Sequence, residues 1–217
     1  STLSSEIKKA FPACTKSHHI LPVGFNKDFL NIEHQEDKKY DVIYSGNFSQ
    51  WKGLDILVEA ISIIKHQYNR DIRAVLIGAN DQTKQQYEDQ AEELKVLDNI
   101  EIVKRVEHKK IYDYISQSKI GVLSNKYDAD GLLFTSPLKL YEYLGSGLKV
   151  VVSRLPSIES NIDQSLVYYA TPENPHSFAK EILNALDDDT FDINKIKEFS
   201  KSYTWESRSK SFMKFIS

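Results

Sequence analysis

The sequence predicts an α/β fold with a mainly parallel sheet of about six strands. From Tyr40 onward, short β-branched runs alternate with segments of helical periodicity, and this alternation is typical of parallel strands joined by right-handed crossovers. A length of 217 residues is enough for one large domain or two small ones. Helices on both faces of the sheet would give three α/β/α layers, a Rossmann-like arrangement.

Six segments have the composition and length of buried strands. They cover about residues 41–44, 74–77, 100–103, 120–123, 150–152 and 166–169. Apolar residues three and four positions apart predict helices between them. These helices cover about residues 54–68, 81–97, 109–115, 136–144, 175–187 and 205–216.

Composition and charge exclude several classes of protein. Apolar residues make up 41% of the chain and charged residues 27%, which is incompatible with a disordered tail or a fibre. The single cysteine, Cys14, cannot form an internal disulfide. With 28 basic and 31 acidic side chains, the chain lacks the positive excess of a nucleic-acid binder. We therefore expect no nucleic-acid partner.

The sequence contains no apolar run of the roughly 20 residues that span a bilayer, and it does not begin with a signal peptide. A cytoplasmic location is therefore the expectation. Peripheral association with the inner membrane face would have to come from a part of the protein outside this sequence.

Ligands of open parallel sheets bind beyond the carboxyl ends of the strands, so the residues that follow each strand are candidates for a site. Gly46, Asn47 and Lys52 follow the first strand, and Lys52 directly precedes a predicted helix. A cation beside a helix N-terminus suits a phosphate. The alternative is an ordinary glycine-containing turn with a solvated lysine.

A second candidate segment runs from Thr135 to Glu142. Ser136 can cap the helix that starts there, and the amide groups of Leu138 and Lys139 are free to hold an anion. Glu142 would share their helix face and point back toward the cleft, where ribose hydroxyls would suit its carboxylate. The alternative is an amphipathic helix on which Lys139 and Glu142 form an exposed pair.

The third strand is followed by Arg105 and Val106, which can meet a nucleobase, sugar or phosphate, although a surface turn explains them equally well. No histidine, cysteine or carboxylate cluster has the spacing of a metal site. The sequence also lacks a nucleophile elbow and a P-loop.

The order of these motifs resembles the donor-binding half of retaining glycosyltransferases of the GT-B fold, in the large group 1, or family 4, type. The resemblance runs from about residue 20 to the C-terminus. It is carried by Tyr44-Ser45-Gly46, Lys52-Gly53-Leu54, Leu76-Ile77-Gly78, Ser136-Pro137-Leu138-Lys139-Leu140-Tyr141-Glu142-Tyr143 and Gly145-Ser146-Gly147.

The resemblance implies a metal-independent site without a cofactor for a nucleoside-diphosphate sugar, whether a UDP-, GDP-, ADP- or dTDP-sugar. Lys52 matches the second of two basic residues that hold the diphosphate, whereas Asn47 replaces the first, usually arginine. Glu142 matches the glutamate that binds ribose, and Phe134 replaces the family's other glutamate. Lys52 and Glu142 are therefore the expected catalytic residues. The expected donor-binding residues are Gly46, Asn47, Lys52, Arg105, Val106, Thr135, Ser136, Leu138, Lys139 and Glu142.

The resemblance also predicts how the chain is divided. Residues 1–30 would form an interdomain crossover, 31–202 the donor-binding domain, and 203–217 a helix that returns toward an N-terminal, acceptor-binding domain outside this sequence. Such a chain would bind donor but catalyse little alone. Other possibilities are a non-catalytic module that pairs with another subunit, a nucleotide-sugar epimerase, and a flavodoxin-like binding domain.

Overall fold

The computed structural model describes residues 9–12, 21, 23–127 and 138–217. Within them, six parallel strands form one sheet in the order β3-β2-β1-β4-β5-β6. The strands are β1 Tyr40–Ser45, β2 Ala74–Ala79, β3 Ile100–Lys104, β4 Ser118–Leu123, β5 Lys149–Ser153 and β6 Tyr168–Ala170. The predicted sheet is confirmed.

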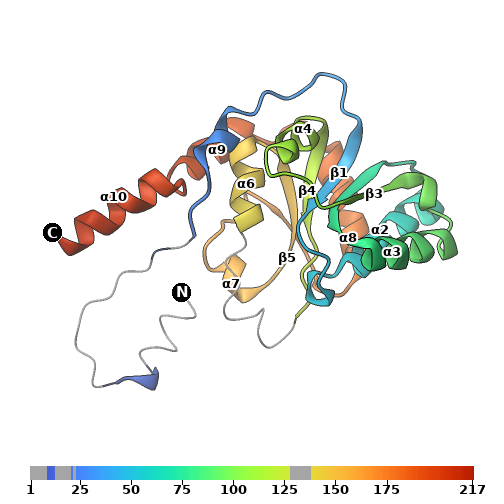
Figure 1. The fold of residues 1–217 in the computed structure, drawn as a ribbon, viewed down its shortest axis with the longest axis horizontal. Helices are drawn as coiled ribbons and strands as arrows, with labels where there is room; N and C mark the ends of the chain where they lie inside the picture. Colours follow the sequence, from blue (N-terminus) through green and yellow to red (C-terminus); the bar gives the residue numbers. More distant parts are fainter. Residues whose placement is uncertain (1–8, 13–20, 22, 128–137) are drawn as a thin grey trace.

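Helices cover both faces of the sheet (Figure 1). One layer holds α2 Leu54–Gln67, α3 Asp81–Glu93 and α8 Pro175–Asp187, and the other holds α4 Lys110–Ser116, α6 Leu138–Ser146, α7 Pro156–Glu159 and α9 Ile193–Lys201. Strand residues alternate between the two cores: Val42 and Tyr44 face the first, Ile43 the second. The predicted α/β/α layering is therefore confirmed.

Short segments complete the fold. Three are 3₁₀ helices, η1 Lys27–Asn31, η2 Gln50–Lys52 and η3 Leu97–Asn99, and the last helix is α10 Trp205–Ile216. Figure 1 shows α10 extending away from the body of the domain. The prediction missed η1, η2, α7 and α9. It also ran the helix from residue 81 to 97, whereas α3 ends at Glu93 and the chain turns at Lys95, which has a φ of 58°. It placed the last strand at 166–169 because Leu166 continues its apolar run. Leu166 instead closes a turn, since its amide donates to Asp163 O at 3.0 Å.

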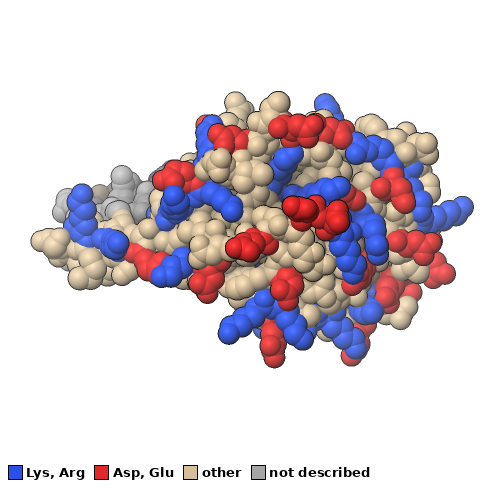
Figure 2. All heavy atoms as spheres, turned by 90° about the horizontal axis from the view of Figure 1, so that it is seen from above, with Lys and Arg blue, Asp and Glu red and all other residues tan. Residues whose placement is uncertain are grey.

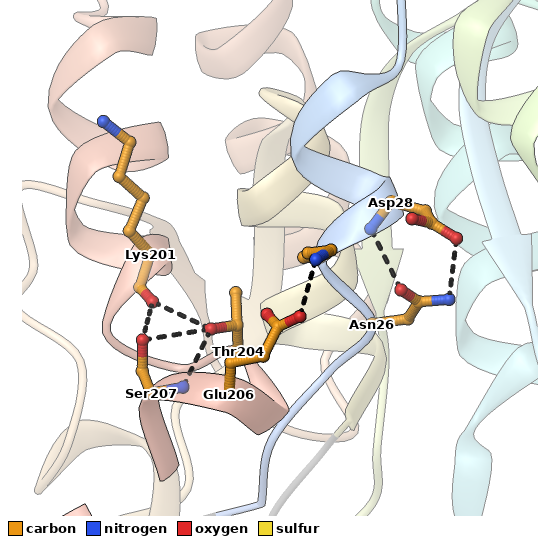
Figure 3. Close-up of polar contacts among 7 residues, drawn as sticks. Asn26, Asp28, Lys201, Thr204, Glu206 and Ser207 are labelled. Carbon is orange, nitrogen blue, oxygen red and sulfur yellow. Dashed lines mark hydrogen bonds and ion pairs between the residues drawn. The ribbon is translucent and has the colours of Figure 1, made fainter. Parts of the chain in front are cut away.

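The segment around Phe25 is tied to the start of α10. Phe25 N donates to Tyr203 O and Trp205 N donates to Phe25 O, both at 3.0 Å. Figure 3 shows the polar contacts beside this crossing: Thr204 caps α10, and Lys27 pairs with Glu206 at 2.7 Å. The predicted crossover and C-terminal segments thus lie against each other, while the division at 30 and 202 stays a prediction.

Charged residues are spread over the surface. Figure 2 shows Lys and Arg side chains interspersed with Asp and Glu over the face in view. This mixture matches the near balance of 28 basic and 31 acidic residues. Within the described part of the chain, no helix is long and apolar enough to cross a membrane.

Tyr143 joins α6 to the carboxyl end of β1. Its side chain is fully buried, and its hydroxyl accepts from Ser45 N at 2.7 Å and lies 3.0 Å from Ser45 Oγ. The ring lies on Gly121 of β4, where a Cβ atom would come within 2.4 Å of it. Burial raises the pKa of Tyr143, so the phenol stays protonated. One side chain thereby sets the position of α6 over the sheet.

Replacing Tyr143 by phenylalanine should lower the free energy of unfolding by about 1–3 kcal/mol, because the Ser45 amide is left buried without this acceptor. Urea denaturation followed by circular dichroism measures the change. Tyr68→Phe is the matched control, since Tyr68 is 48% exposed and should change stability by less than about 0.5 kcal/mol. Equal losses in the two variants would contradict the role given to the Tyr143 hydroxyl.

Candidate functional site

A cavity of about 420 Å³ lies at the carboxyl ends of the first strands, beside the start of α6. The chain passes from β1 to β2 and β3 on one side and places β4 on the other side of β1. Such a reversal of strand order is where open α/β sheets bind ligands. We call this space the carboxyl-end cavity; it is lined by Ser45, Gly46, Asn47, Ile77, Gly78, Arg105, Val106, His108, Ile111 and Lys139.

The structure brings together most of the residues predicted for the site. The predicted residues that line the cavity are Gly46, Asn47, Arg105, Val106 and Lys139. Lys52 and Glu142 are not part of the lining: Glu142 pairs with Lys139, and Lys52, whose pKa is lowered by burial, is close enough for the charge of Lys139 to lower it further. Leu138, 36% exposed, opens α6 at the surface. Phe134, Thr135 and Ser136 lie outside the described residues, so the predicted helix cap is not seen.

Two glycines allow the loops around the cavity to pack closely. Gly78 has a φ of 122°, and a Cβ atom there would lie 1.9 Å from Gly46 O. Gly53 has a φ of 65°, and a Cβ atom there would lie 2.0 Å from Ser124 O. Neither conformation suits a residue with a side chain. Ser124 also donates to Lys52 O at 3.1 Å, which holds Lys52 beside the end of β4.

Lys52 presents a positive charge without a matching carboxylate. Burial, followed by the charge of Lys139, lowers the pKa of Lys52 to about 8. Its ammonium lies over the Trp51 ring, 3.8 Å from the ring centre. Among the residues that the structure describes, no carboxylate pairs with it, whereas neighbouring Lys126 pairs with Asp55 at 2.6 Å. An ammonium in this state favours an anionic ligand.

Glu142 is a buried carboxylate at the edge of the same site. It is 2% exposed. Lys139 Nζ lies 2.7 Å from Oε2, and His108 Nε2 lies 3.7 Å from Oε1. The alternative of an exposed Lys139–Glu142 pair is therefore wrong: the pair forms, but α6 turns Glu142 inward. Although Lys139 is close to Oε2, the alignment gives no hydrogen bond, so this oxygen keeps its capacity to accept one.

Sequence analysis missed His108. It lies just after β3, close to Arg105 and Val106, and it lines the cavity. Its ring packs edge-on against Phe29 and Tyr112, with centroids 5.7 and 5.8 Å away. The only feature of the sequence that could have indicated a site role for His108 is its position shortly after a predicted strand. As for metals, the part of the chain described here holds no group of three or more histidine, cysteine or carboxylate side chains that could bind an ion.

The sequence profile of the family described as Glycosyl transferases group 1 matches residues 26–203. The chain belongs to this family. A search of curated proteins found no match. The group 1 profile spans every strand of the sheet and all the described residues of the site.

Solved structures agree on the fold of this group 1 domain. Sucrose-phosphate synthase from Thermosynechococcus elongatus matches 99% of the chain with a TM-score of 0.77 and 16% identity, over 56% of its own length. Anabaena Alr3699/HepE in complex with UDP matches 89% with a TM-score of 0.71 and 13% identity, over 55% of its length. The chain thus spans little more than half of either protein.

The C-terminal domain of the group 1 protein LpcC from Francisella tularensis gives a further match. The alignment covers 87% of this chain and 98% of that domain, with a TM-score of 0.58 and 16% identity. The chain therefore has the Rossmann-like fold of a C-terminal GT-B domain.

Lys139→Met should lower the free energy of unfolding by about 1–3 kcal/mol, because it leaves the buried Glu142 carboxylate without its nearest cation. Adding Glu142→Gln to this variant should restore part of the loss. A double-mutant cycle in urea should give a coupling of about 1 kcal/mol or more.

The control cycle uses Lys84 and Glu88, a partly exposed pair on α3 at 3.5 Å. Its coupling should stay below about 0.5 kcal/mol. A coupling between Lys139 and Glu142 no larger than that of the control would mean that the buried pair does not stabilise the fold.

Proposed function

We propose that the chain binds the nucleoside-diphosphate sugar donor of a retaining glycosyltransferase. The observation that carries the proposal is the Lys52 ammonium, half-buried beside Lys139 and without a carboxylate partner in the described chain. A donor supplies what this site lacks: a diphosphate for the cations and vicinal hydroxyls for Glu142. The UDP in the HepE complex, a protein of similar fold, supports this class of ligand.

Each part of the donor has a matching part of the site. The diphosphate would lie between Lys52 and Lys139, over the turn at Gly46, where its charge offsets theirs. Glu142 would accept hydrogen bonds from the ribose. The base would lie toward Arg105 and Val106, which line the far side of the cavity. Thr135, Ser136 and Leu138 remain proposed ligands at the start of the helix.

In transfer, the bond between the sugar and the diphosphate breaks, and negative charge develops on the departing phosphate. Lys52 and Lys139 would stabilise this charge from fixed positions, which is the main contribution that this domain offers to catalysis. No protein-bound metal or other cofactor takes part in the proposal. Glu142 would act by holding the ribose, and thereby the leaving group, in place.

The acceptor would bind to another domain of a longer protein. This chain spans about half the length of the full glycosyltransferases that it matches, and α10 offers exposed apolar side chains, among them Trp205, Phe212 and Met213. We propose that these contact an N-terminal domain. A cytoplasmic setting, with any contact with a membrane made through that other part, belongs to the same proposal.

A non-catalytic module that pairs with another subunit is the second candidate, and Asn47 favours it. Asn47 lines the cavity at a position where relatives usually carry arginine. Asparagine is neutral and so adds no charge for a diphosphate, and its side-chain oxygen already accepts from Ser49 Oγ at 2.9 Å. Whether the chain binds any donor decides between the two candidates.

Isothermal titration calorimetry with UDP-, GDP-, ADP- and dTDP-sugars tests the proposal. At least one should bind, and Lys52→Met should weaken that binding about tenfold or more, because a charge-assisted contact is lost. Lys84→Met, on the surface of α3, is the control and should leave the affinity unchanged. Binding of none of the four donors would overturn the proposal in favour of the non-catalytic module.

Donor affinity should also fall at high pH. Lys52 titrates near pH 8 in the free chain, and a bound diphosphate stabilises the ammonium and so raises its pKa. The complex therefore keeps a proton that the free chain loses above about pH 8. Affinity should be constant below this pH and fall by up to about tenfold per pH unit above it.

Lys52→Arg is the control for this pH dependence, because arginine keeps its charge throughout this range. Calorimetry at about pH 7, 8 and 9 should give a falling affinity for the wild-type chain and a flat profile for the arginine variant. The same slope in both would show that another group is responsible.

A further inference from the structure

We propose that His108 is a positioning residue for the donor's ribose. It would hold the Glu142 carboxylate in the orientation that accepts the sugar hydroxyls, and so make the site prefer ribose to 2′-deoxyribose. The inference rests on the proposed function, since it concerns how the same cavity recognises one part of a nucleoside diphosphate.

Two basic residues from different elements flank the Glu142 carboxylate. Lys139, on α6, lies 2.7 Å from Oε2, and His108, in the loop after β3, has Nε2 3.7 Å from Oε1. The loop residue and the helix residue therefore approach the two oxygens separately. Glu142 is 2% exposed, so the orientation of its carboxylate depends on the groups packed around it, and Lys139 and His108 are basic residues among them.

One part of the His108 ring is packed against other rings, although 55% of the side chain is exposed. Phe29 of η1 and Tyr112 of α4 meet it with interplanar angles of 80° each. Phe29 is fully buried and packs edge-on against Tyr112 with the ring centroids 4.8 Å apart. The backbone is fixed as well, because Ile111 N donates to His108 O at 3.1 Å. The aromatic contacts support part of the ring, while the residue still lines the cavity.

The distance from His108 to Glu142 is too short for a ligand atom between the two groups, so a hydroxyl that contacts both would lie beside them. At 3.7 Å, Nε2 and Oε1 lie beyond ordinary hydrogen-bond length. A ribose hydroxyl that donates to Oε1 has an oxygen lone pair available for an N–H of the imidazole. The hydroxyl would then join carboxylate and imidazole, and the 2′-deoxy analogue would leave both without that partner.

The other explanation is that His108 only stabilises the fold, through its ring contacts with Phe29 and Tyr112. The two explanations differ in what they predict for ligands. A structural role would change the affinity for ribose and deoxyribose ligands alike, whereas a positioning role changes the ratio between them.

The experiment measures the ratio of affinities for three pairs of probes: UDP and dUDP, GDP and dGDP, and ADP and dADP. For the pair that binds best, the wild-type chain should prefer the ribose form by about tenfold. His108→Phe keeps a ring against Phe29 and Tyr112 but removes the nitrogen, and should reduce this preference to less than about threefold. His108→Gln keeps an N–H donor and should retain more of it.

His176→Phe is the matched control, because His176 is an exposed histidine of α8, away from the cavity lining. Its ribose preference should equal that of the wild-type chain. His108→Ala provides a second nitrogen-free variant should the larger ring of phenylalanine unfold the chain, and circular dichroism verifies the fold of each variant.

Three results would overturn the inference. If His108→Phe and His108→Ala weaken the binding of the ribose and deoxyribose forms equally, the ratio of the two affinities does not change. That result removes the positioning role and leaves the proposed function intact. A wild-type chain that binds the ribose and deoxyribose forms with equal affinity also removes the positioning role and leaves the proposed function intact. A wild-type chain that binds none of the six nucleotides overturns this inference, and the proposed function falls with it only when the four donor sugars, the dTDP-sugar among them, also fail to bind.

Discussion

The contact between the Tyr143 hydroxyl and the Ser45 amide is the constraint on which the site depends. It ties α6, which carries Lys139 and Glu142, to the end of β1, which leads into the turn at Gly46. The two sides of the carboxyl-end cavity come from segments almost a hundred residues apart in sequence, and this buried bond is 2.7 Å long. Because a helix is rigid, fixing Tyr143 also fixes the neighbouring Glu142 and, one turn earlier, Lys139.

The site carries an electrostatic cost at Lys52 that the paired lysines of the fold avoid. Lys126 and Lys119 pair with aspartates at 2.6 and 2.7 Å, whereas Lys52 has no such partner in the described chain, and the nearby charge of Lys139 helps to lower its pKa. An anion that binds between Lys52 and Lys139 removes the repulsion between the two ammonium groups, and the free energy thereby released contributes to its affinity. The absence of a pairing carboxylate at Lys52 is thus more informative about function than any contact that Lys52 makes.

The sequence predicted the sheet and most helices well, because both depend on local periodicity. It also grouped Gly46, Arg105 and Lys139 correctly, because parallel strands place their carboxyl ends at one edge. Periodicity failed for α9, where Ile196 is the one buried apolar residue in nine. Periodicity also left open whether Glu142 points inward, since that depends on the rotation of α6 about its own axis, which the buried Tyr143 fixes. The sequence could not predict His108 as a site residue for a similar reason. The position of its ring depends on packing against Phe29, which is distant in sequence.

Lys139 would have a central place in the proposed diphosphate site. Asn47 stands where the family resemblance implies arginine, so Lys139 would be the second cation near Lys52, and Lys139 is already paired with Glu142. A bound diphosphate would compete with Glu142 for this ammonium. If Lys139 turned toward the phosphate, the carboxylate would need other donors, and the proposed ribose hydroxyls beside His108 would replace it. Recognition of the diphosphate and of the ribose would therefore be coupled through the single side chain of Lys139.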